Sequence, residues 1–73
     1  MKNFEKAFIE RRLAVLIDGD NAQPNTLELI LHEVMKYGTI TIRRIYGDWT
    51  MPQMETWKRY LPTNAVQPIQ QFK

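Results

Sequence analysis

The segment that most constrains the fold is residues 13–17, Leu-Ala-Val-Leu-Ile, in which every side chain is apolar. The run is too short for a helix, and charged residues flank it on both sides. A short run without polar alternation is typical of a strand buried on both faces of a parallel sheet. The next residues, Asp18-Gly19-Asp20-Asn21, favour a turn. The sequence therefore predicts a buried strand that delivers two aspartates to a solvent-facing turn.

A helix is predicted to follow this turn. Apolar side chains recur along one helical face at Leu27, Ile30, Leu31, Val34 and Met35. Asn25 and Glu28 have the spacing of a capping box at the start of the helix. Gly38 fits a left-handed residue that ends the helix. Residues 25–37 thus form the first predicted helix.

The rest of the chain is predicted to alternate strand, helix and strand. Residues 39–46 are rich in β-branched side chains, and a strand there would place Ile40 and Ile42 on one face. Residues 50–61 predict a second helix capped by their first residue, a threonine. Residues 65–72 predict a third strand. The order β-α-β-α-β with short connections is typical of an α/β fold with a parallel sheet.

Pro68 indicates the order of the strands. Proline cannot donate a ladder hydrogen bond, so the third strand should lie at a sheet edge, as it does in the order 3-2-1. Because parallel crossovers are right-handed, this order places both helices on one face of the sheet. The other face is then bare, and the first strand is an open apolar edge. The chain is therefore expected to be the N-terminal half of a larger domain, or to complete itself by association.

Composition limits the classes of protein and site. The chain has 73 residues, a net charge of +2 and no cysteine, which excludes disulfides and thiolate zinc sites. The charge is too small to indicate nucleic-acid binding by itself. Residues 1–12 carry charges throughout and lack the apolar core of a signal peptide, so we interpret them as a lead-in. No apolar run approaches the ~20 residues that span a bilayer. We expect a soluble, cytoplasmic protein.

Three carboxylates are predicted at the end of the sheet where ligands bind in open α/β folds. Asp18 and Asp20 follow the first strand, and Asp48 follows the second. Neighbouring strands lie ~4.8 Å apart, so the three can surround one cation, and hard oxygen ligands favour Mg²⁺ or Mn²⁺. The same residues also form ordinary turns, and Asp48 can simply cap the turn that it begins. The position after a buried parallel strand favours a functional site at Asp18 and Asp20.

Two other patterns suggest other roles for this region. An Asp-x-Asp after an apolar strand also occurs in haloacid-dehalogenase-like phosphatases, where Asp18 would be the nucleophile, although their motif continues with Gly-Thr rather than Asn-Ala. Basic and aromatic residues alternate around the second crossover, which suits contact with phosphates and unpaired bases. Arg44 and Trp49 are the substrate-binding candidates from that group.

Four motifs together resemble one family. LAVLIDGDNAQP, VMKYG, TIRRIYGDW and AVQPIQQF occur in this order, and together they are similar to the first half of bacterial NYN domains, PIN-like proteins of the LabA-like group. The resemblance implies a three-layer, PIN-like parallel sheet with strand order 3-2-1-4-5 and metal-dependent cleavage of RNA. It also implies that Asp18 is a catalytic metal ligand. Asp20 would be a second ligand or hold a water beside the metal, and Asn21 would orient Asp18 or contact the substrate.

The resemblance also implies that part of the site is missing. Residues 13–73 correspond to the N-terminal half of such a domain, without its later strands and acidic residues. A C-terminal half or a second copy would cover the bare face and the edge of the first strand. We expect a Mg²⁺- or Mn²⁺-dependent ribonuclease that acts on single-stranded RNA. The alternative is a module of the same fold that binds RNA or a protein without cleavage.

Overall fold

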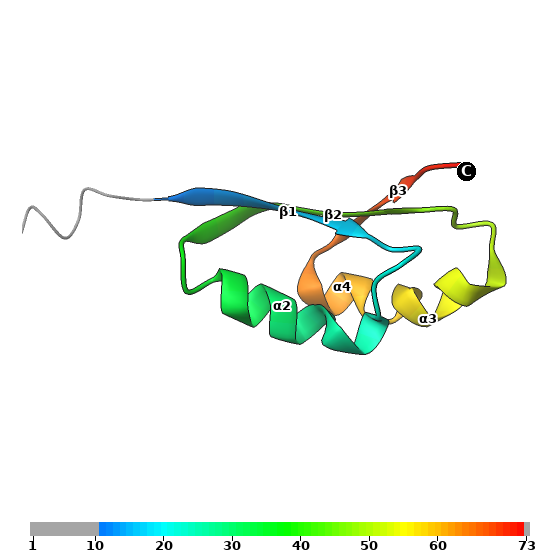
Figure 1. The fold of residues 1–73 in the computed structure, drawn as a ribbon, viewed down its shortest axis with the longest axis horizontal. Helices are drawn as coiled ribbons and strands as arrows, with labels where there is room; N and C mark the ends of the chain where they lie inside the picture. Colours follow the sequence, from blue (N-terminus) through cyan, green and yellow to red (C-terminus); the bar gives the residue numbers. More distant parts are fainter. Residues whose placement is uncertain (1–10, 73) are drawn as a thin grey trace, which may run out of the picture.

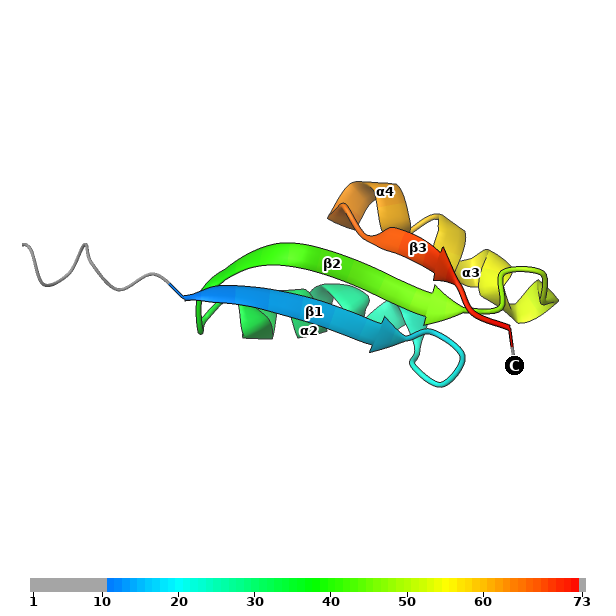
Figure 2. The ribbon, with the colours of Figure 1, turned by 90° about the horizontal axis from the view of Figure 1, so that it is seen from above.

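Three parallel strands form one sheet in the computed structural model, which describes residues 11–72. They are β1 (Arg12–Asp18), β2 (Thr39–Gly47) and β3 (Gln67–Gln70), in the order β1-β2-β3 (Figure 2). The predicted α/β class and strand order are confirmed, with Pro68 in an edge strand. The predicted lead-in falls outside the described residues except for its last two positions, and Arg12 already belongs to β1.

Both crossovers run on the same side of the sheet, as predicted (Figure 1). The first consists of the 3₁₀ turn η1 (Pro24–Thr26) and helix α2 (Leu27–Val34). The second consists of η2 (Pro52–Met54), α3 (Glu55–Lys58) and α4 (Leu61–Asn64). Between residues 11 and 72, no helix has the length and apolar character needed to cross a membrane.

The hydrophobic core lies between the sheet and these helices. The strands contribute Val15, Ile17 and Ile45, and the crossovers contribute Leu27, Leu31, Met54, Trp57, Leu61 and Val66. The opposite face of β1 is open, since Leu16 is 60% exposed. The predicted bare face is therefore confirmed, because the helices cover only one of the two faces of β1.

A β-bulge changes the orientation of the residues at the start of β2. Leu13 pairs with Ile40 but Ala14 pairs with Ile42, so Thr41 is an extra residue opposite β1. Ile40 therefore packs against the core, while Ile42 is 38% exposed on the bare face. The prediction that these two isoleucines share a face is wrong, because strict alternation does not survive an inserted residue.

The predicted helix caps do not form as expected. The N-cap residues, Thr26 for α2 and Met51 for η2, make no side-chain capping bond. No described glycine has a positive φ, so Gly38 is not left-handed. Gly38 instead leaves space for the backbone directly before β1, because a Cβ at position 38 would lie 2.5 Å from the Arg11 carbonyl oxygen. The left-handed residue is Ala65, with φ of 55°, at the end of α4.

Candidate metal and nucleic-acid site

The turn after β1 is held by bonds from three directions. The Gly19 N–H donates to the Tyr46 carbonyl at 2.8 Å, which extends the pairing with β2 by one residue. The Ala22 N–H donates to the Asp18 carbonyl at 2.9 Å and closes the turn. The Trp57 indole N–H donates to the Gly19 carbonyl at 3.0 Å from the second crossover. The turn is therefore a fixed platform for its two aspartates.

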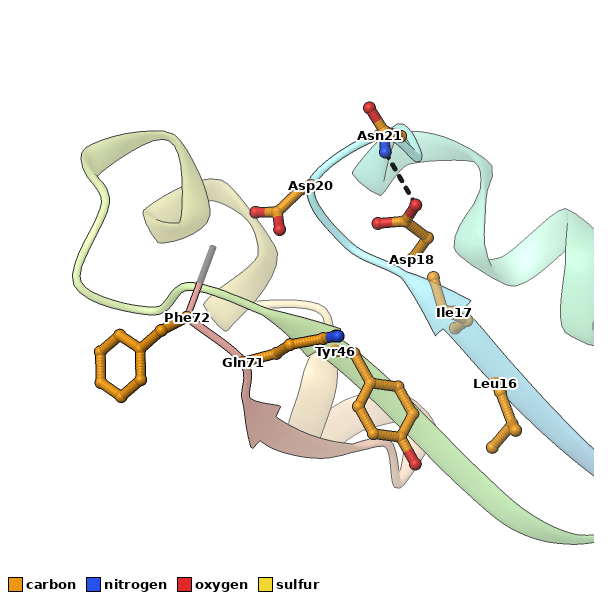
Figure 3. A pocket seen from close by; sticks show the side chains of 8 residues that line it. All are labelled: Leu16, Ile17, Asp18, Asp20, Asn21, Tyr46, Gln71 and Phe72. Atoms are coloured by element: carbon orange, nitrogen blue, oxygen red, sulfur yellow. Dashed lines mark hydrogen bonds between the residues drawn. The ribbon is translucent and has the colours of Figure 1, made fainter.

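Asp18 presents its carboxylate to solvent in a fixed orientation. The Asn21 side-chain amide donates to Asp18 Oδ2 at 2.7 Å (Figure 3). Of the two roles expected for Asn21, the structure contains the contact that orients Asp18. The other carboxylate oxygen makes no hydrogen bond within the described chain, so it can accept a ligand.

Asp20 has a buried carboxylate oxygen without a partner. Its Oδ1 is shielded from solvent and accepts no hydrogen bond from residues 11–72. The oxygen lies against Gly47, where a Cβ would be in ordinary contact with it at 3.4 Å. A buried carboxylate oxygen without a donor is costly, and a cation compensates that cost. Asp18 and Asp20 therefore fit part of a site for a hard divalent ion.

Asp48 has a local structural role. Its Oδ1 accepts from the Thr50 N–H at 3.1 Å, the Thr50 hydroxyl at 2.6 Å and the Gln70 side-chain amide at 2.9 Å. The expectation that Asp48 caps its own turn is confirmed. Across residues 11–72, no three acidic, histidine or cysteine side chains converge on one point. The predicted cluster of Asp18, Asp20 and Asp48 is therefore not formed by the chain as described.

A pocket of about 610 Å³ lies beside the acidic turn. One side is polar and carries Asp18, Asp20 and Asn21 (Figure 3). The other side is formed by the ends of the strands and the segment after β3, with these side chains: Leu16, Ile17, Tyr46, Gln71 and Phe72. It lies at the carboxyl ends of the parallel strands, where ligands bind in open α/β sheets.

The comparison with protein families identifies the chain. The model of the NYN domain matches residues 12–73, which is nearly the whole chain. The chain belongs to the NYN domain family. NYN domains are members of the PIN-like nuclease superfamily, which agrees with the parallel sheet described above. No match was found among curated proteins or among solved structures.

Two of the predicted substrate contacts of this NYN domain lie on different surfaces. Arg44 pairs with Leu16 of β1 and points to the bare face of the sheet, where it is exposed. Trp49 is half-buried, and its indole N–H donates to the Ile69 carbonyl at 3.0 Å. Trp49 therefore links the segment after β2 to β3 through a hydrogen bond. Its predicted contact with substrate stays a prediction.

Three residues of the NYN site were not predicted to lie there. Trp57 belongs to the core, and its indole also holds the acidic turn. Gln71 and Phe72 were assigned to a strand, yet they follow β3 and line the pocket. The signal that points to Gln71 and Phe72 is topological, because residues that follow the third strand lie at the same end of the sheet as those that follow the first.

Proposed function

We propose that this NYN domain hydrolyses RNA phosphodiesters with Mg²⁺ or Mn²⁺ bound at Asp18 and Asp20. The observation that carries the proposal is the buried, unpartnered Oδ1 of Asp20 beside the oriented carboxylate of Asp18. Magnesium in phosphoryl-transfer sites is commonly bound by one or two carboxylates together with substrate phosphates. Two aspartates therefore suffice for a first ligand set.

The chain's own residues would hold the reacting groups in place. Asp18 and Asp20 supply the negative oxygens, and Asn21 keeps Asp18 in one rotamer through its 2.7 Å bond. Trp57 fixes the backbone between the two aspartates. A bound divalent ion supplies activation of water and polarisation of the phosphoryl oxygen. Asp48 would act only indirectly, through the turn that it orders.

We further infer that other residues complete the site. Between residues 11 and 72 the two carboxylates have no third partner, one face of the sheet is bare, and β1 is an edge strand. A C-terminal half of the domain, or a second copy of the chain, would cover the bare face. The same segment would supply additional acidic ligands for the metal. This supports the division in which residues 13–73 are one half of the domain.

Metal binding is tested by thermal unfolding with and without Mn²⁺. Because a ligand that binds only the folded state stabilises it, Mn²⁺ should raise the melting temperature of the wild-type protein. The Asp18→Asn and Asp20→Asn variants should lose that rise. Glu33→Gln removes an exposed acid on α2, remote from the turn, and should keep it. An equal rise in all four proteins would contradict a metal site at the turn.

Cleavage is tested with a fluorescent single-stranded RNA in Mn²⁺ or Mg²⁺. We expect Asp18→Asn to lower the rate by at least about a hundredfold, since removing a metal ligand costs several kcal/mol of transition-state stabilisation. Equal rates in the wild type and the variant would refute the nuclease proposal. RNA binding without cleavage would favour the non-catalytic module. Turnover of p-nitrophenyl phosphate that requires Asp18 would favour the phosphatase.

A further inference from the structure

The pocket beside the acidic turn has two sides of different chemistry. Asp18 and Asp20 on one side suit a cation and a phosphate bound to it. The other side carries two aromatic residues, Tyr46 and Phe72; Figure 3 shows Gln71 between them and the Phe72 ring pointing away from Tyr46. A nucleotide has the same two parts, an anionic phosphate and a flat, largely apolar base. The pocket therefore matches a nucleotide better than a phosphate alone.

Phe72 is the most exposed large apolar side chain of the described chain, at 73%. Its position is fixed by the backbone, because the Gln71 N–H donates to the Gly47 carbonyl at 2.8 Å and holds the segment after β3 against the end of β2. An exposed aromatic ring on a fixed backbone is a typical platform for stacking an unpaired base. The volume of about 610 Å³ lies within the range of small-molecule sites.

We propose that Tyr46 and Phe72 form a stacking subsite for bases next to the scissile phosphate, and that this subsite is the physical basis of the preference for unpaired RNA expected of this nuclease family. The inference rests on the proposed nuclease function. A base inside a duplex is already stacked on its neighbours and cannot enter the pocket without unpairing. Stacking on a ring is tolerant of sequence, so the subsite selects unpaired nucleotides rather than one base.

Arg44 extends the same surface away from the pocket. It lies two residues before Tyr46 on the bare face, a separation of ~6.6 Å along a strand. Its guanidinium is exposed and can contact a neighbouring phosphate of the same RNA strand. Arg44 and Tyr46 therefore share the bare face of the sheet, with Tyr46 nearer to the acidic turn.

The test compares steady-state cleavage of single-stranded RNA by the wild type and Phe72 variants. Phe72→Ala should raise KM by roughly tenfold with little change in kcat, because stacking is made in the bound substrate as well as in the transition state. Phe72→Trp should restore the wild-type KM. Tyr37→Ala is the matched control, since Tyr37 is an exposed aromatic in the turn before β2, at the opposite end of the sheet.

A substrate that lacks one base separates the possible outcomes. With an abasic nucleotide next to the cleaved bond, the wild type and Phe72→Ala should have the same KM. A difference that persists on this substrate would overturn the subsite. So would equal cleavage of duplex and single-stranded RNA, or a Phe72→Ala variant that loses only self-association, which would make the pocket a protein contact. If the wild type cleaves no RNA with any metal, the nuclease proposal itself fails.

Discussion

Trp57 serves both the core and the candidate site. Its ring is 2% exposed, and its N–H is the donor that holds Gly19 between the two aspartates. Trp57→Phe keeps most of the apolar contact and leaves a buried carbonyl without a partner, which should cost about 2 kcal/mol of unfolding free energy. It should also reduce the Mn²⁺-induced rise in melting temperature.

Trp49→Phe provides the control for that prediction. It also removes an indole hydrogen bond, here to the Ile69 carbonyl, but it does not touch the acidic turn. Thermal unfolding of both variants with and without Mn²⁺ is the measurement. A reduced metal effect in Trp49→Phe, or an unchanged one in Trp57→Phe, would contradict the anchoring role of Trp57.

Gly47 is required by space rather than by backbone conformation. No described glycine has a positive φ, so alanine can adopt its backbone angles, but the new Cβ would lie 2.5 Å from Met54 Cε. Because the conflict is with the flexible end of the Met54 side chain, we expect Gly47→Ala to cost no more than about 1 kcal/mol in chemical denaturation, the low end of the range for overpacking. The cost should be smaller in a Met54→Ala background. Strictly additive effects of the two substitutions would show that the steric conflict is not the cause.

At the scale of elements, the end of α4 contains a strained residue, and a substitution can relieve that strain. Ala65 adopts φ of 55°, a conformation that is strained for residues with a Cβ and ordinary for glycine. We expect Ala65→Gly to raise the free energy of unfolding by up to about 1 kcal/mol, measured by urea denaturation. Ala14→Gly in β1 is the control and should destabilise by ~0.5–1 kcal/mol. Destabilisation by Ala65→Gly would contradict the expected relief of strain.

The strand order and the bare face of the sheet were more predictable from the sequence than the β-bulge and the helix caps. Pro68 and the handedness of crossovers predict the strand order and the bare face, because both rules depend only on hydrogen-bond donors and chain direction. The bulge at Thr41 and the missing helix caps were not predictable, since each depends on competition between neighbouring backbone bonds. Thr26, for example, donates its hydroxyl to the Gln23 carbonyl at 2.6 Å.

The candidate site was also predictable from the sequence only in part. The strand end places Asp18 and Asp20 together, whereas the partners of Asp48 come from two different segments. Gln70, which lies 22 positions later in the chain, donates one of the bonds that occupy Asp48. Sequence spacing contains no information on such a contact, so the three-carboxylate cluster was a reasonable prediction that the described fold does not form.

On the scale of the whole molecule, the bare face of the sheet exposes large apolar side chains to solvent. Leu16 and Ile42 lie on it at 60% and 38% exposure. We expect Leu16→Lys to lower the binding of a hydrophobic dye and to reduce concentration-dependent association, seen in sedimentation velocity. Because the side chain is exposed, the free energy of unfolding should change by no more than about 0.5 kcal/mol.

Leu29 on helix α2 provides the control for the Leu16→Lys prediction. Leu29 is 71% exposed on α2, away from the sheet, so Leu29→Lys makes the same chemical change on another surface. It should leave dye binding and association near the wild-type values. If both variants behave alike, general surface charge rather than the bare face controls association.

The bond from Trp57 to Gly19 also has a consequence for folding. It joins residues that are 38 positions apart, a longer separation than that of any other side-chain hydrogen bond in the described chain. Contacts of long sequence separation pay the larger loop-closure entropy and tend to form after local ones. We therefore expect the acidic turn to become ordered only when the second crossover docks on the sheet. Until that step, a nascent chain would contain both aspartates without the arrangement that lets them act together.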